Sequence, residues 1–359
     1  MKVSQIDTEV YGRLADALDR LPIGFPRTKS GVELQILERL FSPEEAKVAS
    51  HMTGTIEAVE TIAQRADLPK DEVEEKLTAM LSRWVIWGSI EDGVRKYRLA
   101  PYVVGIYEVQ SETMDHDLAH LFERYWMEGG GEGIMKYHPD THRVDPAHAA
   151  LEKSEVILPY NDVRKLMLQA KSFQVRNCIC RRQQELLGTK RCEFPVRNCI
   201  TFFSMELPES PNTITKEEAL KLLDEAEEMG LVHCVANQQR GLFWVCNCCG
   251  CCCGILRGIL ELGMENTSVR ANYYAVCDPD QCKGCGTCED RCHVKAVSVP
   301  VNGTATIDRT KCIGCGVCVT GCPNEAMSLK LRPDAEMLVP PENYRAWEQA
   351  RLRNRGLLP

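Results

Sequence analysis

Cysteine is missing from the front half of this chain: no cysteine precedes Cys178, and all 20 lie between Cys178 and Cys322. Long apolar runs are missing too, since no stretch approaches the roughly 18 apolar residues of a membrane-spanning helix. Residues 1–10 hold no apolar segment typical of a secretory signal. We therefore expect a cytoplasmic protein without a membrane span. Because disulfides are rare in that compartment, so many cysteines indicate metal binding.

An excess of positive charge is also missing, since the net charge of the 359 residues is -8. That balance argues against a protein that binds phosphate backbones over its whole surface. The glycines match neither G-x-G-x-x-G nor G-x-x-x-x-G-K, so no nucleotide site is predicted. Apolar residues make up 44% of the chain, which suits a globular protein of several domains.

Residues 31–110 are predicted to form a helical domain that ends in a β-hairpin. Ser42-Pro43-Glu44-Glu45 has the pattern of a capping box with proline at the first helical position. Helical patterns follow over residues 55–66 and 70–84, and apolar segments then flank an Asp92-Gly93 turn. This order resembles a winged helix-turn-helix domain. With 14 acidic and 9 basic residues, the segment favours docking to a protein over binding to DNA.

The next two regions differ in their cysteine content. Residues 111–150 are predicted to be a helical linker with a glycine-rich stretch, and residues 151–265 a cysteine-rich region of mixed α/β structure. In the latter we expect a strand at residues 156–160 and a helix that begins at the capping box of Thr215 and Glu218.

The most specific motif lies near the C-terminus. A run of four cysteines with the spacing C-x2-C-x2-C-x3-C begins at Cys282, and a second begins 30 residues later at Cys312. In such runs three cysteines bind one cubane cluster, and the fourth binds the other cluster. Glycines between the cysteines let the backbone wrap closely around the sulfur atoms.

The doubled run resembles the bacterial two-[4Fe–4S] ferredoxins over residues 273–332. The resemblance implies a fold of two short hairpins and two short helices around two [4Fe–4S] clusters. It implies that one cluster is held by Cys282, Cys285, Cys288 and Cys322, and the other by Cys312, Cys315, Cys318 and Cys292. A zinc site is the alternative interpretation, but zinc does not need eight thiolates in this doubled register.

One position departs from the ferredoxin pattern. His293 follows the fourth cysteine of the first run, where the family normally has proline. The change either loosens the turn after Cys292 or places a titratable group beside a cluster, and it removes no ligand.

A second constellation consists of Cys178, Cys180, Cys192 and Cys199. If the chain is extended at Cys178, then Cys178 and Cys180 lie on one face of a strand. Basic residues nearby would offset the negative charge of a thiolate-bound cluster. We predict a third cluster held by these four cysteines; the alternative is a set of buried free thiols with one loop disulfide.

The densest stretch is C-N-C-C-G-C-C-C-G, with six cysteines in eight positions: Cys246, Cys248, Cys249, Cys251, Cys252 and Cys253. It follows a predicted strand at residues 241–245 and precedes a predicted helix at residues 255–260. Strand alternation would place Cys246, Cys248 and Cys252 on one face and the other three on the opposite face. The stretch therefore suits a further metal centre that bridges two sites. Cys234 and Cys277 are additional ligand candidates, and the alternative treats these cysteines as small apolar side chains.

The whole arrangement from residue 150 to 335 resembles a group of long cysteine-rich 4Fe-4S ferredoxin-domain proteins of anaerobic bacteria and archaea. We expect an α+β, multidomain chain that ends in a tail at residues 333–359. The leading hypothesis is an iron–sulfur electron-transfer protein or oxidoreductase subunit, not itself an enzyme, that exchanges single electrons with redox partner proteins. The alternatives are an oxidoreductase with a catalytic centre at residues 246–253 and a redox-sensing transcription regulator.

Overall fold

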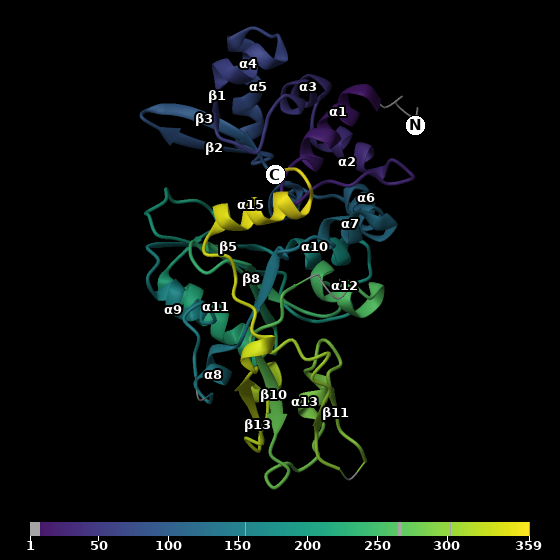
Figure 1. The fold of residues 1–359 in the computed structure, drawn as a ribbon, viewed down its shortest axis with the longest axis vertical. Helices are drawn as coiled ribbons and strands as arrows, with labels where there is room; N and C mark the ends of the chain where they lie inside the picture. The colour runs from purple at the N-terminus through teal and green to yellow at the C-terminus, as the bar shows by residue number, and fades with distance from the viewer. Residues whose placement is uncertain (1–7, 155, 265–267, 302, 359) are drawn as a thin grey trace. The chain divides into compact units, whose positions relative to one another are not determined.

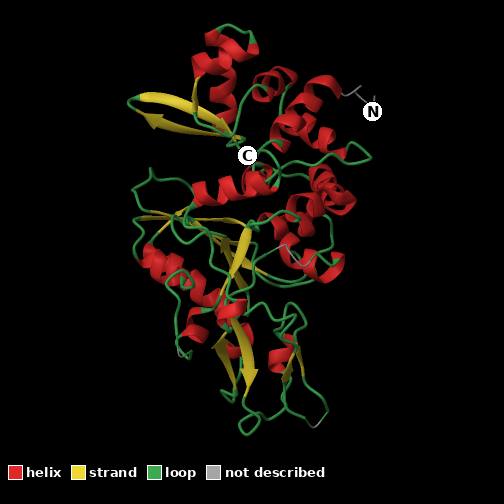
Figure 2. Cartoon of the chain, in the orientation of Figure 1, coloured by secondary structure: helices red, strands yellow, loops and turns green. Residues whose placement is uncertain are grey.

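The computed structural model describes residues 8–154, 156–264, 268–301 and 303–358. The chain forms two compact units: Met1–Tyr137 with Arg182–Thr189 and Glu348–Pro359, and His138–Arg181 with Lys190–Trp347. Helices hold 41% of the chain and strands 17%, which agrees with the α+β class (Figure 2). Within the described segments, no helix is both long enough and apolar enough to cross a membrane.

Helices dominate the first unit. They are α1 (Thr8–Asp19), α2 (Val32–Leu40), α3 (Pro43–Ser50), α4 (Val59–Ala66), α5 (Lys70–Ser82), η1 (Tyr102–Ile106), η2 (Glu108–Glu112), α6 (His116–Tyr125), η3 (Trp126–Gly130), α7 (Gly131–Met135) and most of α15 (Tyr344–Asn354). The predicted capping box is confirmed: the Glu45 N–H donates to Ser42 Oγ at 3.2 Å, and the Ser42 N–H donates to Glu45 Oε2 at 2.9 Å. Two of the N–H groups that have no partner within the helix at the start of α3 are thereby satisfied.

The predicted hairpin of this unit is confirmed as well. β2 (Ile86–Glu91) pairs antiparallel with β3 (Val94–Leu99), and β1 (Glu57–Ala58) adds a third strand beside β3. Asp92 and Gly93 both have positive φ angles, 52° and 77°, as a two-residue turn between twisted strands requires.

A six-stranded antiparallel sheet forms the centre of the second unit. Its order is β4 (His142–Asp145), β8 (Val232–Ala236), β9 (Trp244–Cys248), β6 (Arg197–Phe203), β5 (Ser172–Asn177) and β7 (Thr213–Ile214). The strand expected at residues 156–160 is absent: residues 156–158 are irregular and residues 159–160 form a turn. These residues form a loop instead, and the Leu158 N–H donates a hydrogen bond to the Tyr273 hydroxyl at 3.0 Å.

One face of this sheet packs against two helices. α9 (Val163–Leu168) and α11 (Lys216–Glu228) contribute to a core that contains Ile200, Val235 and Val245. Because strand side chains alternate between faces, the neighbouring cysteines at 199, 234 and 246 lie on the opposite face. Three more helices complete this part of the unit: α8 (His148–Leu151), α10 (Ile179–Leu186, whose later residues belong to the first unit) and α12 (Gly254–Leu262).

The rest of the second unit consists of short elements around two loops. β10 (Tyr273–Cys277) and β13 (Met327–Leu331) lie side by side as an antiparallel pair (Figure 1). A smaller pair joins β11 (Val297–Ser298) and β12 (Thr306–Ile307). The short helices α13 (Thr287–Asp290) and α14 (Val317–Thr320) each begin just after a cysteine-bearing loop.

Candidate metal centres

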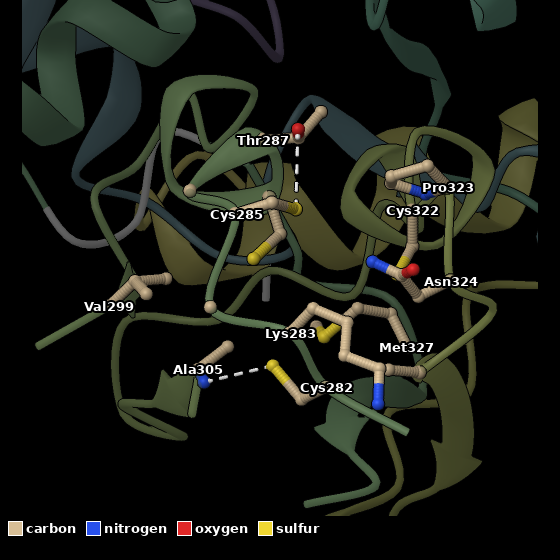
Figure 3. Close-up of a pocket in the computed structure, with 14 residues that line it drawn as sticks. Cys282, Lys283, Cys285, Thr287, Val299, Ala305, Cys322, Pro323, Asn324 and Met327 are labelled. Carbon is tan, nitrogen blue, oxygen red and sulfur yellow. Dashed lines mark hydrogen bonds between the residues drawn. The ribbon is translucent and has the colours of Figure 1, made fainter. Parts of the chain in front are cut away.

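Four cysteines from both C-terminal runs line one cavity: Cys282, Cys285, Cys288 and Cys322. Figure 3 shows Cys282 and Cys285 on one loop and Cys322 on another around this cavity. The Ala305 N–H donates to Cys282 Sγ at 3.4 Å, and Thr287 Oγ1 lies 3.6 Å from Cys285 Sγ. The bond from Ala305 lowers the pKa of Cys282. Donors aimed at sulfur stabilise the thiolate form, which is the form that binds metal.

The other four cysteines of the two runs form a second group: Cys292, Cys312, Cys315 and Cys318. Burial, together with the neighbouring Cys292 and Cys312, raises the pKa of Cys315 to about 12. The pKa of Cys318 rises for the same reasons, burial first. The Ala296 N–H donates to Cys292 Sγ at 3.1 Å. Buried thiols this close to one another require a cation to become thiolates together.

The two cysteine loops differ in exposure. In the first loop Cys285 is exposed, whereas in the second loop Cys312 and Cys318 are buried. The second loop is bonded to the body of its unit, because the Ala147 N–H donates to Cys315 O at 2.9 Å and Arg332 Nη2 donates to Cys312 O at 2.6 Å. The second group, with two buried cysteines, therefore lies deeper in the unit than the first, in which Cys288 alone is buried.

His293 joins the first run to the cysteine-dense stretch. Its Nε2 donates to Gly230 O at 2.9 Å, and its Nδ1 accepts the Gly250 N–H at 3.2 Å. Burial lowers the pKa of His293, in agreement with a neutral ring that donates at one nitrogen and accepts at the other. Proline could make neither bond. The departure from the ferredoxin pattern thus serves a contact that the sequence alone did not reveal.

Strand register brings three cysteines of the middle region into a row. Cys246 in β9 is paired with Cys199 in β6 on one side and with Cys234 in β8 on the other. Cross-strand partners on one face lie close enough for their side chains to touch. The thiols of Cys199 and Cys248 interact with Cys246 and, with burial, raise the pKa of Cys246 well above its ordinary value.

Next to this row lie Cys178, Cys180, Cys248 and Cys253. The thiols of Cys178 and Cys180 interact, Cys180 interacts with Cys253, and Cys253 interacts with Cys248. Two helices begin here: the Arg181 N–H of α10 lies against Cys178, and the Leu256 N–H of α12 lies against Cys253. Each of these N–H groups lowers the pKa of its thiol. The contact with Cys180 and burial nevertheless raise the pKa of Cys178, and the pKa of Cys253, which the contact with Cys180 lowers, is raised overall by Cys248 and burial. Free N–H groups at helix starts favour negative charge.

A separate group consists of Cys192, Cys249, Cys251 and Cys252, whose sulfur atoms all lie within 4.8 Å of one another. Cys192 comes from the loop between α10 and β6, and the other three from the turn between β9 and α12. Arg181 lies between the two middle groups, since its guanidinium bonds Cys249 and interacts with Cys178 and Cys248.

Residues 305–328 match the family model of the 4Fe-4S binding domain. The chain contains a 4Fe-4S ferredoxin domain. The matched segment includes Cys312, Cys315, Cys318 and Cys322, so at least one [4Fe–4S] cluster is indicated. A comparison with curated proteins gave no match.

Upstream of the ferredoxin domain, the structure regroups the predicted ligands. The set of Cys178, Cys180, Cys192 and Cys199 is divided: Cys192 joins the group at residues 249–252, and Cys199 joins the strand row. The two cysteines do not share a strand, because β5 ends at Asn177 and Cys180 lies in the first turn of α10. The two thiols nevertheless lie together, with Cys178 just before α10 and Cys180 within its first turn.

The predicted alternation across residues 246–253 is correct only up to Cys248, where β9 ends. Beyond it the chain turns at Gly250, and α12 starts after Cys253, so Cys252 lies with Cys249 and Cys251 while Cys253 lies with Cys248. Of the two additional candidates, Cys234 belongs to the strand row and Cys277 lies beside Cys282. The stretch thus contributes cysteines to two groups, as predicted, but the turn between β9 and α12 divides them and not the alternation of side chains along a strand.

Proposed function

We propose that this protein transfers single electrons through two [4Fe–4S] clusters in its ferredoxin domain and a third cluster in the middle region. The observation that carries the proposal is the crossed grouping of the two runs: Cys322 lines the cavity of the first run, and Cys292 lies with the second. Crossed ligation of this kind is typical of two-cluster ferredoxins. A bound [4Fe–4S] cluster supplies a one-electron couple.

In this proposal the residues of each site have separate roles. Cys282, Cys285, Cys288 and Cys322 hold the exposed cluster, and Cys292, Cys312, Cys315 and Cys318 hold the buried one. Backbone donors such as the N–H groups of Ala305 and Ala296 point at the sulfur atoms and favour negative charge on them. Exposure of Cys285 marks the face where a redox partner protein exchanges electrons.

For the third cluster we propose Cys178, Cys180, Cys248 and Cys253 in place of the set expected from sequence. These thiols neighbour one another in a chain of contacts, and two helix starts direct N–H groups at them. Arg181 is buried beside them and offsets the charge of the thiolates. In this proposal the third cluster gives electrons a further site in the same unit as the two ferredoxin clusters.

The winged-helix-like unit is proposed to dock a protein partner. α5, the helix that would enter a DNA groove, exposes Asp71, Glu74 and Glu75 along a surface hollow. Phosphates would be repelled from this face, whereas a basic protein surface would be attracted.

Metal content tests the number of clusters. After anaerobic purification we expect about twelve irons and about twelve acid-labile sulfides per chain, four of each per cluster. Cys178→Ser is expected to lower both values by about four and to leave the electron paramagnetic resonance signals of the ferredoxin domain in place. Cys199→Ser, in the neighbouring strand row, is the matched control and is expected to keep all twelve. A wild-type value of about eight would remove the third cluster from the proposal.

Exposure predicts the order in which the ferredoxin clusters are lost. With an iron chelator present under limited oxygen, we expect about four irons to leave first, because solvent reaches Cys285 and not Cys318. Cys285→Ser is expected to accelerate this first phase several-fold and to leave the second phase unchanged. If iron release from the ferredoxin domain of the wild-type protein, followed optically, showed a single phase, the two clusters would be equally protected.

A further inference from the structure

The sulfur atoms of Cys192, Cys249, Cys251 and Cys252 are spaced for one ion and not for a cluster. Cys192 Sγ lies 4.0 Å from Cys249 Sγ and 3.8 Å from Cys252 Sγ. Cys251 Sγ lies 3.7 Å from Cys249 Sγ and 3.6 Å from Cys252 Sγ. Four sulfurs bound tetrahedrally to one ion at about 2.3 Å are separated from one another by roughly 3.8 Å. The four distances therefore match four of the six edges of such a tetrahedron, and the other two sulfur pairs lie within 4.8 Å.

A cubane cluster needs a different spacing. Each of its thiolates binds a different iron at a different corner, so the four sulfurs lie farther apart than around one ion. Across the described ranges, the group at Cys192 is alone in bringing three or more possible ligand atoms within 4.8 Å of one another. The proposed cubane ligands of the ferredoxin domain instead surround a cavity. Close sulfur atoms thus distinguish the site for a single ion at Cys192 from the cluster sites of the ferredoxin domain, which lie in the same unit.

We propose that Cys192, Cys249, Cys251 and Cys252 form a mononuclear tetrathiolate site for one divalent transition-metal ion, zinc or iron. Soft thiolate ligands in a tetrahedron select these metals over magnesium, calcium or manganese. The site goes beyond the electron-transfer proposal, and neither proposal depends on the other.

Charge in the group agrees with a bound cation. Contacts from Cys251 and Cys252, and then Arg181, hold the pKa of Cys249 below its ordinary value, while the contact with Cys249 raises the pKa of Cys251 to about 12. Several thiolates at these distances repel one another strongly. A divalent ion neutralises two of the four negative charges, and the buried guanidinium of Arg181 offsets part of the rest.

The site also explains how an irregular loop is held. Residues 189–195 contain no helix or strand, yet Cys192 and Phe194 pack against Leu231 and the cysteine turn. On the other side, the bond from Gly250 N–H to His293 fixes the same turn to the ferredoxin domain. A metal ion would bind one cysteine of the loop and three of the turn. It would thereby link the two segments, which are not paired as strands.

Metal analysis of anaerobically purified protein tests the proposal. If zinc is bound, we expect about one zinc per chain, with zinc-edge X-ray absorption showing four sulfur ligands at about 2.3 Å. If iron is bound, Mössbauer spectra of iron-57-enriched, reduced protein are expected to show one isolated high-spin tetrathiolate iron per chain beside the cluster signals. Neither species in the wild-type protein would overturn the proposal.

Variants assign the ion to these residues. Cys192→Ser is expected to lose the single zinc or isolated iron and to keep its acid-labile sulfide, whereas Cys178→Ser is expected to keep the single ion. Loss of about four irons together with about four sulfides from Cys192→Ser would show a cubane instead, and loss of no metal would remove Cys192 from the site. Should Cys192→Ser fail to fold, Cys192→His is the second variant: its imidazole nitrogen can still bind zinc or iron, so we expect it to keep the single ion, with one sulfur ligand replaced by nitrogen in the X-ray absorption spectrum.

Discussion

Replacement of Gly314 by alanine is expected to lower the free energy of unfolding by about 3–4 kcal/mol and to release the buried ferredoxin cluster. Gly314 lies between Cys312 and Cys315 and has a φ of 72°, which costs a residue with a Cβ about 1–2 kcal/mol. An added Cβ would also overlap the backbone carbonyl of Tyr273 in β10. Backbone atoms of a paired strand cannot move aside cheaply, so the loop must shift. Thermal unfolding and iron content measure the two effects.

Gly286→Ala provides the matched control. Gly286 follows Cys285 in the first loop, at the position that Gly316 holds in the second, and has a φ of 83°, but an added Cβ there would meet nothing within 4 Å. We expect this variant to lose only about 1 kcal/mol, from backbone strain, and to keep its full iron content. Equal losses in the two variants would mean that the overlap with Tyr273 is relieved without cost.

Local pattern predicted those parts of the site whose ligands lie in one short loop. The resemblance of the runs at Cys282 and Cys312 to two-cluster ferredoxins implied two crossed groups, in which the three cysteines of one loop are joined by the fourth cysteine of the other run. Likewise, the capping box at Ser42 and the turn at Asp92 depend on neighbouring residues only, and both are present. Nothing beyond the segment itself was needed for the capping box and the turn.

The middle cysteines depend on contacts that are distant in sequence. Cys192 and Cys249 are brought together by the loop after α10, and strand register alone puts Cys199 beside Cys246. A one-residue change of register would reverse the face of Cys246. The end of β9 at Cys248 and the start of α12 at Gly254 decide the partners of Cys252 and Cys253. Sequence patterns locate the end of a strand or the start of a helix only to within one or two residues, and a shift of that size changes which cysteines are neighbours.

Arg291 is the residue whose loss is expected to affect both stability and redox chemistry. Its guanidinium donates to Val317 O at 2.7 Å in the buried loop and to Glu227 O and Glu228 O, both at 2.8 Å, at the end of α11. Arg291→Gln removes these charge-assisted bonds, and we expect a loss of about 3 kcal/mol in the free energy of unfolding. The side chain also interacts with Cys315 and Cys318. Without its charge, the reduction potential of the buried cluster is expected to fall by on the order of 50 mV.

Arg291→Lys separates the two effects. A lysine keeps the positive charge but cannot reach three carbonyl groups in the fork geometry of arginine. We therefore expect this variant to lose most of the stability that Arg291→Gln loses, while the potential of the buried cluster stays close to that of the wild type. Redox titration followed by electron paramagnetic resonance measures the potential, and the exposed cluster serves as an internal reference because Arg291 interacts with Cys315 and Cys318 of the buried group. If Arg291→Lys and Arg291→Gln shifted the reduction potential equally, the shift would come from a change in loop geometry and not from the loss of the charge of Arg291.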